Sequence, residues 1–285
     1  SGSITPPAYD SLTMDTLHYK GLYCNNGIFS EVSDVLATEE ALTVSINEVQ
    51  FTVTMRSPGN ELELLQGLLF TEGIFKHRME PHQLKAVQVN SKGFITHIDL
   101  QLPESQILKK FEASRNIISA SSCGLCGRTS FEETLSSNKI ENSAVMNPEL
   151  VSGMFSAMKQ HQNEFKLSGG THAAAAFDLK GKLLSVFEDI GRHNAVDKLI
   201  GSLIQKQVLQ SAALVTVSGR VSYEIVNKVV AAGIPFLAAV SAPSSMAVEM
   251  AQEAGLTLLA FCRDGKLTIY SNPEHMVQGE LIQKP

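Results

Sequence analysis

The feature that most constrains the fold is an alternation of helix and strand patterns near the C-terminal end of the chain. The expected strands are almost continuously apolar, which is typical of strands buried on both faces of a parallel sheet. The first two lead into helices, as in the crossover units that cover such a sheet. We therefore predict a three-layer α/β domain with strands over 213–217, 234–240, 256–261 and 266–270 and helices over 195–205, 222–232 and 245–254.

The earlier part of the chain has shorter and more mixed patterns. Period-two alternation predicts hairpins over 41–56 and 84–100, and leucines at helical spacing predict a helix over 61–71 that ends at Gly73. A longer amphipathic helix is expected over 148–165, followed by strands over 173–177 and 183–187. The predicted organisation is a loose N-terminal arm over 1–15, a small α+β domain over 16–111, a loop region over 112–146 and the α/β domain over 147–285.

Length and composition exclude several classes of protein. A chain of 285 residues is long enough for two ordinary domains. The net charge of −6 argues against a general nucleic-acid binder, and no apolar run reaches the roughly 20 residues of a membrane span. The first 20 residues lack a signal-peptide pattern, and four cysteines are too few for a disulfide scaffold. We expect a cytoplasmic protein in a reducing compartment, without membrane or nucleic-acid partners.

A Cys-x-x-Cys pair, Cys123 and Cys126, lies on a stretch rich in serine and glycine between Arg115 and Arg128. Small and polar residues give this stretch no apolar face to bury, and the arginines favour thiolate over thiol. We therefore expect exposed, nucleophilic sulfur atoms on a mobile loop. The spacing leaves four interpretations open: half of a zinc site, a dithiol/disulfide catalyst, a sulfur carrier, or a turn that happens to hold thiols.

The surrounding sequence weighs against zinc and against thioredoxin-type chemistry. A structural zinc site takes four ligands, and the remaining cysteines, Cys24 and Cys262, stand alone in strand-like segments as small core or edge residues. His172 or His193 could be the third ligand of a catalytic zinc. Zinc deaminases, however, place a His-x-Glu before a Pro-Cys-x-x-Cys, and this chain has neither pattern. The residues before Cys123 do not form the strand that precedes a thioredoxin-type pair, so no metal ligands are predicted.

A second group of candidate residues lies at three strand-to-helix turns. Arg192 and His193 stand at the start of a helix that Asn194 can cap, where backbone N–H groups favour anions. The other two turns are small and rich in hydroxyl groups, and the carboxyl ends of parallel strands meet at one edge. The sequence therefore predicts a phosphate-bearing ligand at this edge, the alternative being plain capped helices. The candidates in these two turns are Ser218, Arg220, Ser241 and Ser244.

His172 is a further candidate because two glycines, Gly169 and Gly170, precede it at the start of an expected strand. Glycines there imply close approach of a ligand or another backbone. His172 could donate or accept a proton, or it could be a structural histidine. Neither a Walker A motif nor a Gly-x-Gly-x-x-Gly fingerprint is present, which disfavours ordinary NTPase and NAD-binding functions.

Taken together, these segments resemble the FdhD family, the sulfur-carrier accessory proteins of formate dehydrogenase. The resemblance covers roughly residues 36–270. The matching stretches are Thr54-Met-Arg-Ser-Pro-Gly59, Gly67-Leu-Leu-Phe-Thr-Glu-Gly73, Ser121-Ser-Cys-Gly-Leu-Cys-Gly127, Gly169-Gly-Thr-His-Ala-Ala174, Glu188-Asp-Ile-Gly-Arg-His-Asn-Ala-Val-Asp-Lys198, Ser218-Gly-Arg-Val-Ser222 and Ala239-Val-Ser-Ala-Pro-Ser-Ser245.

The resemblance implies a cytidine-deaminase-like α/β core without the deaminase zinc set. It implies that a cysteine desulfurase loads sulfur as a persulfide on Cys123, with Cys126 assisting. The sulfur then passes to a molybdenum cofactor bearing two guanine dinucleotides, which serves formate dehydrogenase. A GDP-like nucleotide is expected to occupy the same site. The resemblance places cofactor contacts at Phe261, Cys262, Arg263, Asp264, Gly265 and Lys266, although Cys262 itself is not a family cysteine.

The resemblance also implies a homodimer. A physical reason for one is that the strands over 256–261 and 266–270 would otherwise leave an exposed sheet edge. Two other functions remain open from the residues alone. One is a zinc-dependent hydrolase on the same fold, and the other is a non-catalytic chaperone that binds the cofactor and the apoenzyme. Whether the carrier counts as an enzyme stays open.

Overall fold

A computed structural model of the chain describes residues 18–108, 118–119, 139–141 and 143–276. The predicted N-terminal arm over 1–15, Cys123 and Cys126 lie outside the described residues. The large unit is built on a six-stranded sheet of order β13-β12-β11-β10-β8-β9. Its strands are β8 His172–Phe177, β9 Leu183–Asp189, β10 Leu214–Val217, β11 Phe236–Ala239, β12 Thr257–Arg263 and β13 Lys266–Ile269.

The centre of this sheet is parallel, as the continuous apolar strands predict. β10 pairs in parallel with β11, and β11 with β12. The edges are antiparallel: β8 runs against β10 and β9, and β13 runs against β12. The start of β8 therefore lies at the same edge of the sheet as the carboxyl ends of the parallel strands, which places His172 beside the three predicted turns.

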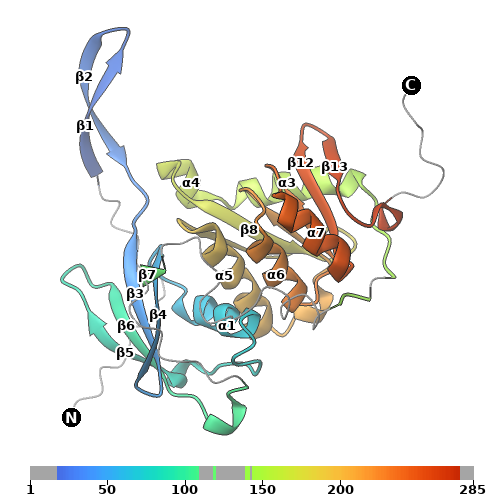
Figure 1. Cartoon of the computed structure of the whole chain (residues 1–285). Helices are drawn as coiled ribbons and strands as arrows, with labels where there is room; N and C mark the ends of the chain where they lie inside the picture. The colour runs from blue at the N-terminus through green and yellow to red at the C-terminus, as the bar shows by residue number, and fades with distance from the viewer. Residues whose placement is uncertain (1–17, 109–117, 120–138, 142, 277–285) are drawn as a thin grey trace.

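Helices cover both faces of the sheet (Figure 1). On one face lie α5 Arg192–Gln205, α6 Tyr223–Ala231 and α7 Ser245–Ala254. α5 buries Val196, Leu199 and Leu203 at helical spacing, and these side chains form the core with alternate strand residues such as Val215 and Leu237. The opposite face packs against α3 Glu149–Gln160. The three-layer prediction is confirmed.

The smaller unit has a five-stranded sheet of order β5-β6-β3-β4-β7 and its own core. Both predicted hairpins form, and β3 and β6 join them in parallel. The helix predicted over 61–71 is α1, and Gly73 with a φ of 68° follows its end. The strands are β3 Glu40–Ile46, β4 Val49–Arg56, β5 Leu84–Val89, β6 Ile95–Leu100 and β7 Ile118–Ser119, and the helix is α1 Glu61–Thr71. Short 3₁₀ turns lie at Pro81–Gln83, Glu104–Gln106, Leu209–Ser211 and Pro273–His275.

The two units meet where α1 crosses α5, and glycines permit the close approach. A Cβ atom on Gly67 would lie 1.9 Å from the carbonyl oxygen of Asp197. On the other helix, a Cβ atom on Gly201 would lie 1.9 Å from the carbonyl oxygen of Glu63. The helix backbones therefore touch directly, and both positions require glycine for a steric reason.

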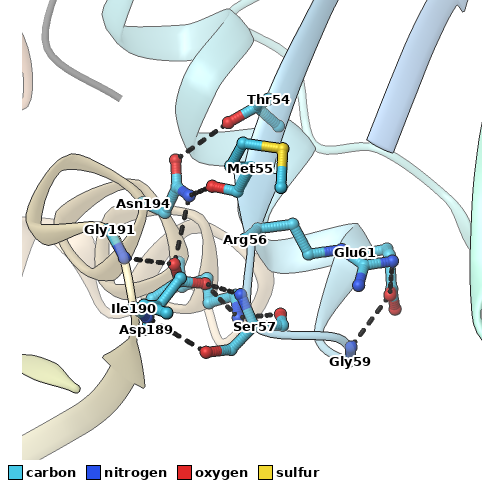
Figure 2. A network of polar contacts seen from close by, with 11 residues as sticks. Thr54, Met55, Arg56, Ser57, Gly59, Glu61, Asp189, Ile190, Gly191 and Asn194 are labelled. Carbon is cyan, nitrogen blue, oxygen red and sulfur yellow. Dashed lines mark hydrogen bonds and ion pairs between the residues drawn. The ribbon is translucent and has the colours of Figure 1, made fainter. Parts of the chain in front are cut away.

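A buried polar network also joins the units (Figure 2). Asp189, at the end of β9, forms an ion pair of 2.7 Å with Lys198 of α5, and both side chains are buried. The other unit supplies Ser57, whose carbonyl accepts from Lys198 Nζ at 3.0 Å and whose N–H donates to Asp189 at 3.1 Å. Asn194 adds a bond of 2.8 Å to the carbonyl of Met55. The network ties the segment after β4 to the turn before α5.

The structure corrects the expectation that Asn194 caps α5. The helix begins at Arg192 with Gly191 as its N-cap residue, and no side-chain capping bond forms. The Asn194 side chain instead donates to Met55 and to the Asp189 carboxylate, the latter at 3.1 Å. The Asn194 side-chain amide, which the sequence suggests as a helix cap, therefore contributes to the contact between the two units.

The single helix expected over 148–165 is also corrected, because two helices form. α3 ends at Gln160, and α4 runs over Asn163–Ser168. The Glu188 carboxylate of β9 accepts from the N–H groups of Glu164 and Phe165, at 2.9 and 2.8 Å, and so starts a new helix. Burial and then the Glu188 charge raise the pKa of Glu164 to about 7.

A separate hairpin, β1 His18–Asn25 and β2 Ile28–Val35, was not predicted as such. Among the described strands, these two pair with each other and with no third one. The loop is Asn26-Gly27, with φ of 49° and 82°, which is the strongest short-range hairpin signal a sequence carries. The ribbon projects from the rest of the molecule (Figure 1).

We expect Gly67→Ala to destabilise the protein by about 1–3 kcal/mol or more, because the new methyl group overlaps the α5 backbone. The matched control is Gly153→Ala in α3, where an added Cβ meets nothing within 4 Å. That change should stabilise the helix by about 0.5–1 kcal/mol. Urea unfolding of the two variants tests this, and equal effects would show that the crossing is looser than described.

We expect Glu164 to make stability fall as pH rises. Its folded pKa of about 7 lies above the usual 4.5, so its favourable protonated form is lost on going from pH 4.5 to above 7. Glu164→Gln should therefore be more stable than wild type by about 1–3 kcal/mol at pH 8, after allowance for its partial exposure, and nearly equal at pH 4.5. Thermal unfolding across this range, with the exposed Glu253→Gln as control, measures it. Parallel curves for Glu164→Gln and wild type would contradict it.

Candidate functional site

A cavity of about 810 Å³ opens between α3, α4 and the carboxyl edge of the large sheet. Its apolar wall includes Val151, Phe155 and Met158 of α3, together with Phe165 of α4. The remaining walls come from the turn between β12 and β13 and from the segment between α4 and β8. The cavity is large enough for a ligand bigger than a single amino acid or phosphate, since small-molecule sites span about 300–1,000 Å³.

The cavity brings together seven of the residues singled out from the sequence. They come from three segments that are far apart along the chain, and the sheet order places those segments side by side. Ser218 is fixed by accepting a hydrogen bond of 2.9 Å from the Ala173 N–H. The seven lining residues are His172, Ser218, Cys262, Arg263, Asp264, Gly265 and Lys266.

The turn between β12 and β13 supplies much of the charge. Asp264 and Gly265 have φ of 53° and 71°, which gives the two-residue primed turn that links antiparallel strands. The turn presents Arg263 and Lys266 on its two flanks, and α3 adds Lys159 from the other wall. Glu149 and Asp264 are the carboxylates in the lining. Cations therefore outnumber carboxylates around a cavity with one apolar wall, which suits an anionic ligand that also has an apolar part.

Cys262 lines the cavity but is a poor sulfur nucleophile. Its side chain is buried, and this burial raises the thiol pKa to about 11. The thiolate is the reactive form of cysteine, so Cys262 stays a thiol near neutral pH. Cys24 lies exposed on β1. The expectation that these two cysteines are a core and an edge residue is confirmed.

The other predicted ligand residues lie outside this cavity. His193 Nε2 lies 3.3 Å from the Ser222 hydroxyl and 3.8 Å from the Glu224 carboxylate. The Ser244 hydroxyl caps α7 by accepting from the Ala247 N–H at 3.2 Å. The residues absent from the cavity lining are Arg192, His193, Arg220, Ser241, Ser244 and Phe261.

Phe261 is directed by an unusual backbone conformation. Its φ is 54°, which is rare for a bulky residue, and the pairing of β12 with β13 is irregular between Ala260 and Arg263. The ring lies 6.4 Å from that of Tyr270, which packs against the α5–α7 core. The segment predicted as one contact surface is therefore divided, with Phe261 apart from the cavity and the next five residues along it.

The two groups of residues meet at Gly219, directly after β10. A Cβ atom there would lie 3.1 Å from His172 Nδ1 and 3.9 Å from Arg192 Cδ. Burial, followed by the charges of Arg192 and Arg220, lowers the pKa of His172, so its imidazole is neutral at pH 7. His172 thus offers a hydrogen-bond donor and acceptor, while the neighbouring arginines carry the positive charge.

Sequence reasoning missed the wall of the cavity that α3 and α4 supply. Lys159, Phe155 and Phe165 carry no motif, because an amphipathic pattern shows only that a helix has a buried side.

Within the ranges that the structure describes, no cluster of three or more metal-ligating side chains occurs, and no helix is long and apolar enough to cross a membrane.

Comparison with known proteins finds a family model and named relatives. The model of the FdhD/NarQ family matches residues 37–277. Two proteins named "Sulfur carrier protein FdhD" are close relatives. The one from Sulfolobus acidocaldarius is 38% identical over 88% of this chain and 94% of its own, and the one from Mycolicibacterium paratuberculosis is 39% identical over 85% and 92%.

A solved structure shares the fold. It is described as a putative formate dehydrogenase accessory protein from Desulfotalea psychrophila, and it matches with a TM-score of 0.71 at 21% identity over 92% of this chain and 99% of its own. The family model, however, spans most of the chain, and the relatives match along nearly their whole length. The chain therefore belongs to the FdhD/NarQ family.

Proposed function

We propose that this protein is a sulfur carrier that accepts sulfur from a cysteine desulfurase and delivers it to a molybdenum cofactor bearing two guanine dinucleotides, for use by formate dehydrogenase. The names of its relatives support the carrier role, and the similar structure, an accessory protein of formate dehydrogenase by its description, supports the client. The observation that carries the proposal is the cavity at the sheet edge, which gathers His172, Ser218 and the 262–266 segment. The cytidine-deaminase-like assignment of the core is part of this proposal.

The sulfur chemistry uses two thiols of this chain, a persulfide donor and a thiol reductant. The Cys123 thiolate attacks the terminal sulfur of the desulfurase persulfide, which leaves a persulfide on Cys123 and a thiolate on the desulfurase. Attack of the Cys126 thiolate on the Cys123 sulfur then releases hydrosulfide and forms a disulfide between the two. The dithiol supplies the two electrons that reduce the transferred sulfur. A cellular thiol reductant returns the pair to its starting state.

The short strand β7 supports delivery near the cavity edge. Ser119 pairs with Thr54 of β4, and the Thr54 hydroxyl lies 3.4 Å from the Asn194 side chain at the start of α5. The Cys-x-x-Cys pair follows β7 in the sequence. In the proposed function, β7 therefore joins the described part of the chain next to the pair to β4, beside the start of α5.

In the proposed function, different groups of described residues bind different parts of the cofactor. Arg263, Lys266 and Lys159 are placed to neutralise phosphate groups, and the apolar wall of α3 suits a heterocycle. The neutral His172 can hydrogen-bond an uncharged ring edge. Arg192 and Arg220, across Gly219, can hold further negative charge of a ligand that extends past the end of β10.

We expect Cys123→Ala to abolish both persulfide formation and activation of formate dehydrogenase, because it removes the nucleophile. Cys24→Ala is the matched control and should retain both, because that thiol lies on β1 outside the cavity. Intact mass after incubation with desulfurase and cysteine should show one added sulfur atom in the wild type and in the control. Normal activation by Cys123→Ala would instead favour a cofactor-binding chaperone.

We expect Arg263→Ala and Arg192→Ala each to weaken GDP binding by roughly 10- to 150-fold, the range for a charge-assisted phosphate contact of about 1.5–3 kcal/mol. Lys180→Ala, in the exposed turn between β8 and β9, is the control and should bind as wild type does. Titration calorimetry measures the three affinities. Unchanged affinity in Arg192→Ala would remove that residue from the site and confine the nucleotide to the cavity.

A further inference from the structure

Helix α4 and the two glycines after it form one wall of the cavity, and we call residues 163–170 the flap. Phe165, Gly169 and Gly170 of the flap line the cavity. No residue of α4 is buried, and its apolar side chains Phe165 and Leu167 are 45% and 62% exposed. A helix that buries so little apolar surface has low local stability, because packing supplies most of the free energy that holds a helix in place. The flap therefore depends on polar contacts to stay against the cavity.

The Glu188 carboxylate of β9 supplies these contacts. Its Oε2 accepts from the Glu164 N–H at 2.9 Å, and its Oε1 accepts from the Phe165 N–H at 2.8 Å. The same Oε1 accepts from the Thr171 hydroxyl at 2.9 Å, directly after the flap. Among the residues that the structure describes, Glu188 is the one side chain outside 163–171 that forms hydrogen bonds with this segment. One carboxylate therefore fastens both ends of the flap.

The flap has a joint at each end. Gly169, with a φ of 67°, and Gly170 connect α4 to β8, and glycine accepts backbone rotations that other residues resist. At the other end, His161 and Gln162 interrupt the helix between α3 and α4. Hinges of moving segments are a few residues of this kind at the ends of regular elements. The flap can therefore turn as a unit once its bonds to Glu188 break.

We propose that the flap is a lid of the cavity and that Glu188 is the latch that holds it closed, opening when a ligand enters or leaves. A carrier has to take up its ligand and later release it, and a wall that opens reversibly serves both steps. The lid concerns the cavity itself. It rests on the proposed function only through the choice of GDP as a probe in the second test below.

The Glu164 side chain couples the latch to pH. Burial and then the Glu188 charge raise its pKa to about 7, while Lys198 of α5 lowers this pKa and Asp189 of β9 raises it. In the open flap the Glu164 carboxyl is in water and returns to its usual pKa of 4.5. Since the closed flap binds this proton more tightly, opening becomes more favourable as pH rises from 4.5 to 7 and levels off above 7.

The first test needs no ligand and follows hydrogen exchange of the 163–171 segment by mass spectrometry, as protection factors corrected for the intrinsic effect of pH. In the wild type we expect protection to fall about tenfold or more between pH 5 and pH 8. Glu188→Gln should lower protection about tenfold or more already at pH 5, because its amide group places N–H donors opposite a backbone N–H of α4. Glu164→Gln should keep high protection at both pH values.

The control for this test is Glu253→Gln, an exposed change in α7 that should behave as the wild type does. Protection of β10 should be equal in all variants, which would show that the rest of the fold is intact. Equal protection of the 163–171 segment in the wild type and in Glu188→Gln would overturn the latch. A wild-type segment that is unprotected at pH 5 would overturn it as well, because the flap would then not be held closed.

The second test separates a lid from a fixed wall. The chain has no tryptophan, so Phe165→Trp places a single fluorescent probe on the flap. Stopped-flow mixing with GDP then gives the association and dissociation rates with and without Glu188→Gln. A lid predicts that both rates rise several-fold when the latch is removed, because opening precedes entry and exit alike. A rise in the dissociation rate alone, or no change in either rate, would overturn the lid. Absence of GDP binding would contradict the proposed function, and the lid would then be decided by hydrogen exchange.

Discussion

The buried ion pair between Asp189 and Lys198 is the interaction on which the arrangement of the two units depends. Neither side chain is accessible to water, and Ser57 from the other unit completes their hydrogen bonds. Removing one partner of such a pair costs about 3–5 kcal/mol, because the remaining charge is left buried without compensation. Ser57 also has to reach this ion pair with correct hydrogen-bond geometry. The network therefore specifies one position of the smaller unit on the larger one.

This position of the smaller unit determines how the turn before α5 lies at the carboxyl edge of the large sheet, where the candidate site is. Asp189 ends β9, and it also accepts from the Gly191 N–H at 2.8 Å, which fixes the turn into α5. Arg192 follows immediately, so the network sets its place beside Gly219 and His172. The glycines at the crossing of α1 and α5 allow the units to come close enough for these bonds to form. In the segment from 188 to 198, Asp189, Asn194 and Lys198 thus hold the turn before α5 in place.

The sequence predicts those helices and strands that are determined by their own residues. The parallel strands follow from continuous apolar runs, and α1 follows from its leucine spacing. The break between α3 and α4 has a distant cause, since the Glu188 carboxylate that starts α4 lies more than twenty residues further along the chain. The role of Asn194 is hidden in the same way, because its partner Met55 belongs to the other unit. The Asn26-Gly27 hairpin is different: its signal is local and was available.

The sequence predicts which residues line the cavity better than it predicts how they are arranged. Shared position at the carboxyl edge correctly brings His172, Ser218 and the 262–266 segment to one cavity. It cannot show that Phe261 turns away, because that depends on a left-handed residue within an irregular strand. Nor can it rank the cysteines. Burial makes the Cys262 thiol at the cavity unreactive, so in the proposed function the reactive thiols come from another segment of the chain. A carrier needs that separation, because a nucleophile fixed in the cavity could not also reach a donor protein.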